Sequence, residues 1–298
     1  MPTTKRKIAL IINSKAKQTD LQNLNRIYEA LKKTDFEILE YIENDKQTIS
    51  QFAEAAAKDN FEMVVAAGGD GTISSVATRL VHSNTALGVI PMGTYNNFAK
   101  DLGIPLDIET AVENLVSGIP KLIDVGEVNG HHFINNSSIG LYPHLVLRRE
   151  MAESKGMPRI FATIHAALKV FQKFPYHKVK LLVGDKETHR ETPLMFFGNG
   201  YYDFDGLNIG ARVLPTDGTL SLYILKNVKR MELLKLSFMA FSNKIHNDPR
   251  FEKHFVSRAT VEVPKKIIYV AKDGEVLKMQ SPLQYKVKQR ALKVIVPK

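Results

Sequence analysis

The sequence of 298 residues contains no cysteine, and this excludes three kinds of site. Disulfide frameworks, thiolate nucleophiles and zinc sites with cysteine ligands all need that residue. The nine histidines form no HExxH motif, and the adjacent His131 and His132 would point to opposite faces of a strand. The lack of cysteine fits a reducing compartment and leaves little basis for a zinc enzyme.

Long apolar runs are also lacking. The run from Ile8 to Ile12 is too short for the hydrophobic region of a signal peptide. The long stretch without a charged residue from Leu80 to Ala99 contains Pro91 and two glycines, so it would be a poor membrane span. We therefore expect a cytoplasmic protein.

Basic residues outnumber acidic ones, 41 to 31, which gives a formal net charge of +10. Such a charge favours anionic partners: nucleic acid, anionic phospholipid headgroups or phosphorylated substrates. The lysines are scattered, and neither an arginine-rich tract nor a recognisable nucleic-acid module occurs. We expect no nucleic acid as partner, and a plain solvated basic surface remains the alternative to lipid headgroups.

The first 124 residues alternate between strand-like and helix-like patterns. Strands are predicted at 7–12, 36–42, 63–67 and 86–90, and helices at 21–31, 48–58, 73–81 and 107–115. Continuously apolar strands separated by helices are typical of a parallel sheet covered on both faces. The pattern predicts an α/β domain at residues 1–124.

Residues 125–298 follow a different pattern. Asn129-Gly130 lies between strand-like runs and predicts a hairpin. Further strands are predicted at 179–183, 194–198, 220–225, 259–263, 267–271 and 291–296, and helices at 160–173 and 231–245. The second domain is thus expected to be mainly antiparallel and β-rich, and a return of its last strand to the first domain is left open.

Two glycine-containing loops follow predicted parallel strands. Gly68-Gly69-Asp70-Gly71-Thr72 comes after the third strand, and 91–97 comes after the fourth. Ligands bind outside the carboxyl ends of such strands, and glycine lets the backbone approach a phosphate closely. Turns without a ligand are the alternative. Walker A and the full dinucleotide fingerprint are absent, which argues against a conventional dehydrogenase.

Six motifs follow one another along nearly the whole chain: GGDGT at 68–72, PMGTYNNFAKDLGIP at 91–105, DVG at 124–126, FINNSSIG at 133–140, TDGTL at 216–220 and DGE at 273–275. With Asn13, this ordered set resembles the diacylglycerol kinase catalytic family, which includes bacterial lipid kinases and sphingosine kinases. GGDGT alone is shared with NAD kinases and phosphofructokinase-like enzymes. The resemblance implies an α/β domain of the NAD kinase/phosphofructokinase type, a C-terminal antiparallel β-sandwich, and ATP in the cleft between them.

The resemblance also implies a reaction, in which Mg-ATP phosphorylates a lipid hydroxyl, with a diacylglycerol-like substrate favoured. The residues that it assigns to the nucleotide are Asn13, Gly68, Gly69, Asp70, Gly71, Thr72, Thr94 and Asn96. Asp70 would also organise Mg²⁺ or orient its loop. In the same way Asp217, with the carbonyls of Leu214 and Thr219, would hold a structural magnesium ion. A plain turn is the alternative at Asp217.

Three further acidic residues are candidates for the chemistry. By the same resemblance Asp273 matches the proposed proton acceptor, and Asp124 would bind the acceptor hydroxyl. If the segment after Asp273 is extended, Glu275 shares a face with it, which would pair two carboxylates. The dipeptide Asp273-Gly274 is also a common turn, which is the structural alternative.

The chain departs from the family pattern at two positions. Many members carry Glu where Ser75 stands and Asp where Asn97 stands, and an amide binds magnesium more weakly than a carboxylate does. A non-catalytic nucleotide- or lipid-binding homologue therefore remains an alternative, as does a soluble-substrate kinase of the NAD kinase type.

Two segments combine apolar and basic residues, 156–176 and 229–245. Such segments can lie at a membrane surface, but we expect their apolar faces to cover the β-sheet. A lipid kinase must still reach its substrate at the membrane, so peripheral membrane association is expected. A homodimer is left open.

Overall fold

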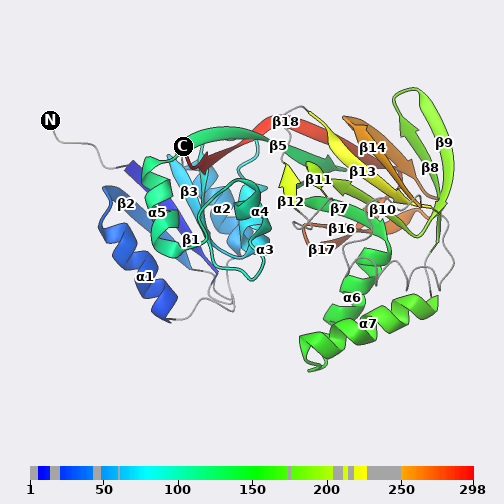
Figure 1. The fold of residues 1–298 in the computed structure, drawn as a ribbon, viewed down its shortest axis with the longest axis horizontal. Coiled ribbons are helices and arrows are strands. Elements are labelled where there is room, and N and C mark those ends of the chain that lie inside the picture. Colours follow the sequence, from blue (N-terminus) through cyan, green and yellow to red (C-terminus); the bar gives the residue numbers. More distant parts are fainter. Residues whose placement is uncertain are drawn as a thin grey trace. The chain divides into compact units, whose positions relative to one another are not determined.

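The computed structural model describes residues 6–13, 21–42, 48–59, 61–173, 176–203, 211–213, 218–226 and 250–298. The chain forms two compact units, Met1–Val125 with Lys288–Lys298, and Gly126–Val287. Two long strands, β5 (Ile119–Val128) and β18 (Leu283–Val296), contribute residues to both units (Figure 1). The C-terminal part of β18 thus belongs to the first unit.

The first unit is built on parallel strands. They are β1 (Arg6–Ile12), β2 (Phe36–Ile42), β3 (Met63–Gly68), β4 (Ala86–Pro91) and the end of β18, in the order β2-β1-β3-β4-β18. β3 and β4 are buried along their whole length, which confirms the reading of their apolar runs. β2 lies at the edge of the sheet and is largely exposed.

Helices cover both faces of this sheet. They are α1 (Leu21–Lys32), α2 (Ile49–Lys58), α3 (Asp70–Ala77), α4 (Asn97–Asp101) and α5 (Ile108–Ser117). Leu10 packs with residues of α1 and α5 in one core. Its buried neighbour Ile11 points to the other face, because side chains alternate along a strand, and α2 and α3 pack there on β1 and β3.

The second unit is an antiparallel β-sandwich. Its strands are β6 (His131–Phe133), β7 (Asn136–Gly140), β8 (His177–Val183), β9 (Lys186–Thr192), β10 (Leu194–Gly198), β11 (Tyr201–Asp203), β12 (Ala211–Val213), β13 (Leu220–Leu225), β14 (Phe251–Val256), β15 (Arg258–Glu262), β16 (Ile267–Lys272) and β17 (Glu275–Gln280), together with parts of β5 and β18. One layer has the order β14-β13-β10-β7-β16-β17, and the other contains β18, β15, β8 and β9 with the β5–β6 hairpin. Both layers contribute to one apolar core, in which the rings of Phe197 and Tyr285 stack at 3.6 Å. The predicted fold class is confirmed.

Two helices, α6 (Leu141–Glu153) and α7 (Arg159–Lys173), pack against each other as a hairpin (Figure 1). The apolar spacing of the sequence predicts α7, whereas α6 was not predicted, although Pro143 in its first turn is a helix-start signal. α6 contacts β7, β16 and β17, whereas large apolar side chains of α7 are exposed, contrary to the expectation that they cover the sheet. The helix predicted at 231–245 lies outside the described residues.

Within the described ranges, no helix combines the length and the apolar character that crossing a bilayer requires.

Candidate functional site

The predicted nucleotide residues gather at one edge of the parallel sheet. Asn13 follows β1, and its backbone N–H donates to Ala67 on β3 at 3.4 Å. Gly68 on β3 and Pro91 on β4 are register partners, so the two glycine-containing loops leave neighbouring strands at the same level. All these residues belong to the first unit, and they lie at the carboxyl ends of its strands, where ligands bind in open α/β sheets.

The helix that follows β3 begins earlier in the GGDGT segment than predicted. α3 begins at Asp70 with Gly69 as its N-cap, whereas the pattern predicted a helix from 73. Asp70, Gly71 and Thr72 therefore form the first helical turn. Backbone N–H groups of a first turn have no carbonyl partner within their helix, and the helix dipole favours negative charge there. This turn can bind an anion such as a phosphate.

Two of the glycines are needed by the fold itself. A Cβ on Gly68 would lie 2.6 Å from the side chain of Thr72. A Cβ on Gly93 would lie 2.7 Å from the Cα of Gly69, so the two loops approach each other through glycine backbone. Any side chain at Gly93 would push these loops apart.

Gly71, in contrast, is required neither by packing nor by its backbone conformation. A Cβ at this position would meet nothing within 4 Å, and its φ is outside the left-handed region. Glycine in the middle of a helix costs roughly 0.5–1 kcal/mol relative to alanine, and in the first turn of α3 this is an upper limit for what Gly71 costs the unliganded protein. A ligand that must approach this backbone closely would account for the glycine.

Side-chain hydrogen bonds brace the two loops. The amide of Asn13 donates to the hydroxyl of buried Thr72 at 3.0 Å, which ties the end of β1 to the first turn of α3. Asn96, in the left-handed region with φ 51°, accepts from Gly93 N at 2.8 Å and donates to Gly93 O at 2.9 Å. Asn13 and Asn96 thus brace the two loops, and Thr94, which stands between Gly93 and Asn96 in the sequence, is exposed.

Asp70 connects the loops to each other. Its Oδ1 accepts the backbone N–H of Phe98, in the first turn of α4, at 3.2 Å. Ser75, on α3, is partly exposed, and Asn97, at the start of α4, is exposed. Asp70 is the single carboxylate between residues 66 and 97.

Asp273 lies in the second unit and anchors a turn. It occupies the β16–β17 turn with φ 45°, followed by Gly274 with φ 90°. Its carboxylate accepts the backbone N–H groups of Ile134 (2.8 Å), Asn135 (2.8 Å) and Asn136 (3.0 Å). These bonds tie the turn to the connection between β6 and β7.

The shared face expected for Asp273 and Glu275 does not form, because the segment is a tight turn and not extended. Glu275 is exposed and forms an ion pair with Lys272 at 3.3 Å across the hairpin. The two carboxylates therefore have different partners. Sequence spacing alone could not show this, since the alternation holds only for a continuous strand.

Asp124 is buried, with 2% of its surface exposed. Its Oδ1 accepts the backbone N–H of Arg290 at 2.7 Å, at a point where β18 takes a positive φ of 48°. This contact supports the backbone of β18, and contact of Asp124 with an acceptor hydroxyl stays a prediction. Of the predicted structural magnesium site, Asp217 and Leu214 lie outside the described residues, while Thr219 is partly exposed just before β13.

In the described part of the chain, no three His, Asp or Glu side chains are grouped as a metal site requires. Magnesium in phosphoryl-transfer sites is held by one or two carboxylates together with substrate phosphates and water. Asp70, beside the first turn of α3, fits that limited role, and the first-turn N–H groups fit the phosphates of a nucleotide.

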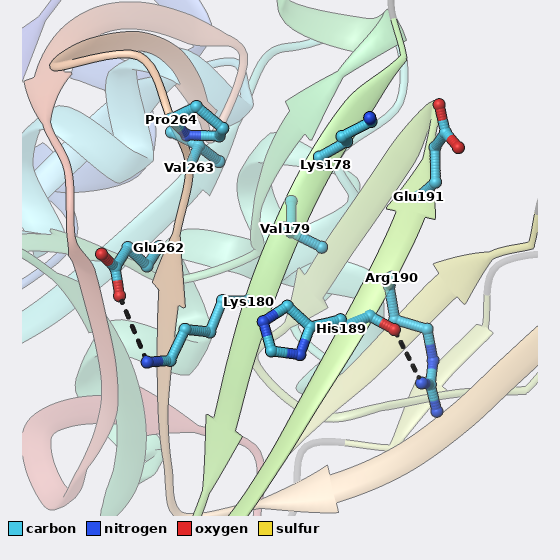
Figure 2. A pocket seen from close by; sticks show the side chains of 9 residues that line it. All are labelled: Lys178, Val179, Lys180, His189, Arg190, Glu191, Glu262, Val263 and Pro264. Carbon is cyan, nitrogen blue, oxygen red and sulfur yellow. Dashed lines mark hydrogen bonds and ion pairs between the residues drawn. The ribbon is translucent and has the colours of Figure 1, made fainter.

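A pocket of about 480 Å³ lies elsewhere, on β8, β9 and the end of β15 (Figure 2). None of the predicted site residues lines it. Figure 2 shows Lys180 reaching Glu262, at 3.9 Å, and Lys180 also pairs with Glu187 at 3.1 Å. Arg190 pairs with Glu252 at 3.1 Å. Lys180 and Arg190 thus already have acidic partners, which makes these two cations less available to an anion.

Comparison with known proteins matches both units. Residues 7–128 match the diacylglycerol kinase catalytic domain, and residues 147–296 match the YegS C-terminal NAD kinase beta sandwich-like domain. The chain is 31% identical over 251 residues to the diacylglycerol kinase of Bacillus subtilis strain 168, covering 83% of this chain and 81% of that protein. The chain belongs to the diacylglycerol kinase family. Family membership indicates a kinase and confirms the resemblance read from the motifs.

Other relatives also match this chain over most of its length. A probable lipid kinase YegS-like protein of Klebsiella pneumoniae strain 342 is 28% identical over 236 residues, which cover 78% of this chain and 77% of that protein. A crystal structure of a diacylglycerol kinase from Bacillus anthracis str. Sterne superposes with a TM-score of 0.71 at 22% identity, covering 99% of this chain and 98% of that one. At 22% identity, the superposition shows a shared fold and nothing more.

Proposed function

We propose that the protein is an ATP-dependent lipid kinase that phosphorylates the hydroxyl group of a diacylglycerol-like lipid. Gly71 carries this proposal: it costs helix stability, has open space where a side chain would stand, and lies in an anion-binding first turn. Family membership indicates a kinase, and the name of the Bacillus subtilis relative supports diacylglycerol as the type of substrate.

Different groups of the chain would bind the phosphates and the magnesium ion of Mg-ATP. Backbone N–H groups of α3 and of the Gly93 loop would hold the phosphates of ATP. Asn96 keeps the Gly93 turn in shape through its two hydrogen bonds, and Asn13 holds the side chain of Thr72 in the first turn of α3. Asp70 would offer an oxygen to Mg²⁺. Bound Mg-ATP supplies the phosphoryl group and neutralises its charge, and such transfer depends mostly on positioning and electrostatics.

A second candidate is a homologue that binds nucleotide or lipid without transferring phosphate. It is favoured by the partners of the two acidic residues predicted for proton transfer. Asp273 accepts three backbone N–H groups and Glu275 pairs with Lys272, so both already have partners in the described structure. Turnover separates the two candidates, because only the kinase transfers a phosphoryl group.

The decisive experiment incubates purified protein with Mg²⁺, ATP radiolabelled on its γ-phosphate, and detergent-dispersed diacylglycerol, ceramide, sphingosine and phosphatidylglycerol. The kinase proposal expects label in phosphatidic acid. If nucleotide raises the melting temperature but no lipid is labelled, the binding homologue is favoured. If ATP neither binds nor reacts with folded protein, the kinase and the nucleotide-binding homologue both fail, and only a lipid-binding homologue is left.

The matched variant is Gly71→Ala. Without ligand it should be as stable as the wild type or up to about 1 kcal/mol more stable, since alanine fits the open space and favours helix. The nucleotide-induced rise in melting temperature and the kinase activity should both be strongly reduced. A Gly71→Ala protein with wild-type activity would remove the observation on which the proposal depends.

A further inference from the structure

The terminal strand of the first unit's sheet is β2 (Figure 1). All seven of its residues, Phe36–Ile42, pair in parallel with β1 in one unbroken register. In the described part of the chain, no strand pairs with the other edge of β2. An edge of this kind presents N–H and C=O groups with which another chain can pair. It is called the β2 edge below.

β2 exposes large apolar side chains on both faces of the sheet. Ile38 and Ile42 are 37% and 47% exposed. Their register partners on β1 pack in one core with α1, so both side chains lie on the α1 face. Leu39 is 48% exposed and points to the opposite face, because side chains alternate along a strand. The helices on the two faces therefore leave β2 incompletely covered.

β2 lacks the features that usually protect a strand edge from association, namely lysine, proline or a bulge. Its sequence is FEILEYI, in which Glu37 and Glu40 are the charged residues. β9, at the other end of the same strand order, has the sequence KETHRET and contains no large apolar residue. The chain thus protects one terminal strand with charge and leaves the other apolar, which indicates that the β2 edge has a partner.

The charges of β2 suit pairing with a second copy of the same strand. In a closed dimer, two copies of one strand related by a two-fold axis run antiparallel. A pairing centred on Leu39 uses all seven residues and sets Glu37 opposite Tyr41 of the second copy. Glu40 then lies opposite Ile38. A pairing centred on either glutamate would set that carboxylate against its own copy, and like charges directly opposite are destabilising.

A basic strand from another protein suits the β2 edge less well, because both glutamates already have partners in their own chain. Glu37 forms an ion pair with Lys7 at 3.5 Å, and the carboxylate of Glu40 accepts the hydroxyl of Tyr28. The exposed groups that still need a partner on β2 are apolar side chains and backbone. A second copy of β2 offers both.

We propose that two copies of this protein associate through antiparallel pairing of their β2 strands, centred on Leu39. The sheets of the two first units then form one continuous sheet. On one face Leu39 meets Leu39 of the second copy, and on the α1 face Phe36 lies opposite Ile42. This association goes beyond the proposed function. It needs neither nucleotide nor lipid, so dimer and kinase activity can fail separately.

Disulfide formation can locate the interface, because the chain contains no cysteine. Directly opposed residues of antiparallel strands have Cα atoms about 4.5–5.5 Å apart, which lies within the disulfide range of about 4.4–6.8 Å. Leu39→Cys should therefore form a disulfide-linked dimer under mild oxidation. The matched control is Ile267→Cys, since Ile267 is 55% exposed on β16 in the second unit and should stay unlinked.

Two further cysteine variants test the register. Ile38→Cys mixed with Glu40→Cys should give a linked dimer that contains one chain of each kind, because these positions lie directly opposite each other. Either variant alone should link poorly, since its two copies are diagonal neighbours about 7–8 Å apart.

Sedimentation equilibrium measures the association itself. The wild type should form a dimer in a concentration-dependent way. Leu39→Lys should weaken this dimer at least about tenfold, because two ammonium groups would face each other at its centre. Ile267→Lys should dimerise like the wild type. Both substituted side chains are exposed, so the circular dichroism spectrum and the melting temperature of each monomer should stay close to the wild-type values.

Three results would overturn the proposal. One is a wild type that sediments as a monomer over the whole concentration series. Another is a dimer that Leu39→Lys leaves intact, because such a dimer would use a different surface. The third is a Leu39→Cys protein that forms no more disulfide-linked dimer than Ile267→Cys does.

Discussion

The carboxylate of Asp70 accepts the backbone N–H of Phe98 at 3.2 Å. Asp70 is the first residue of α3, and Phe98 lies in the first turn of α4, so one acidic side chain joins the two loops at the carboxyl ends of β3 and β4. The same carboxylate stands beside the N–H groups that we propose for phosphate binding. Its charge and its hydrogen bond can be separated by substitution.

Asp70→Asn should keep the hydrogen bond and remove the charge. We expect a loss of about 0.3–1 kcal/mol in the free energy of unfolding, from the weaker interaction with the α3 dipole. Affinity for Mg-ATP, measured by calorimetry, should fall at least about tenfold, whereas affinity for ATP in EDTA should not fall, because a negative charge beside the phosphates is gone. Equal affinity of wild type and variant for Mg-ATP would contradict a magnesium role for Asp70.

The first unit could be predicted from the sequence because its signals are local. Apolar runs such as Met63–Gly68 identify buried strands, and Asp107 caps α5 as its position before an apolar-periodic stretch indicates. The start of α3 was placed too late, since glycines at Gly69 and Gly71 read as a loop although Gly71 is helical. Helix propensity misleads where a glycine serves another purpose.

Gly126 and Phe133 face each other across the β5–β6 hairpin, and a Cβ on Gly126 would overlap the Phe133 ring. Gly126→Ala should therefore destabilise the protein by about 1–3 kcal/mol, the range for an overpacked core. Phe133→Leu makes room for the added methyl group. Urea unfolding should show that the double variant loses less stability than the sum of the two single variants. Additive losses would mean that the glycine is needed for another reason.

Contacts between distant parts of the chain could not be predicted. Asp273 accepts hydrogen bonds from the N–H groups of residues 134–136, which are far from it in the sequence. Likewise, Val294 on β18 pairs in parallel with Leu87 on β4. Nothing in the local pattern of either segment specifies its partner. The exposure of large apolar side chains on α7, such as Ile160 and Leu168, was missed for a related reason: apolar periodicity predicts that a helix has an apolar face, but it does not say what covers that face.

His177 should make stability depend on pH. Burial, together with the nearby positive charges of His144 and Lys265, lowers the pKa of His177 from 6.5 to about 4. Between these two pH values the imidazole of His177 binds a proton in the unfolded chain but not in the folded protein. The contribution of His177 to the free energy of unfolding is therefore fully present above pH 6.5 and is lost as the pH drops from 6.5 towards about 4. Burial also lowers the pKa of His144, which acts in the same direction.

His177→Gln removes this titration. The melting temperature of the variant should fall less steeply than that of the wild type between pH 6.5 and about 4, and part of the slope should remain because of His144. Above pH 7 the two curves should run parallel. Identical slopes over the acidic range would show that His177 is as accessible to protons in the folded protein as in the unfolded chain.

Asp273→Asn separates a structural anchor from a proton acceptor only if stability and turnover are measured together. One carboxylate oxygen accepts from Ile134 and the other from Asn135 and Asn136, so an amide would set an N–H donor against a backbone donor. We expect a loss of about 1–3 kcal/mol in the free energy of unfolding by urea. Loss of activity in this variant therefore cannot by itself identify a base.

Glu275→Gln is the matched control, since its exposed ion pair with Lys272 is worth about 0–1 kcal/mol and its loss should leave the melting temperature nearly unchanged. If Asp273 is only an anchor, the turnover of Asp273→Asn should recover at temperatures well below its lowered melting point. If Asp273 accepts the proton, kcat should stay low at every temperature. A wild-type melting temperature for Asp273→Asn would show that the three backbone hydrogen bonds contribute little, and would leave catalysis as the reason for the carboxylate.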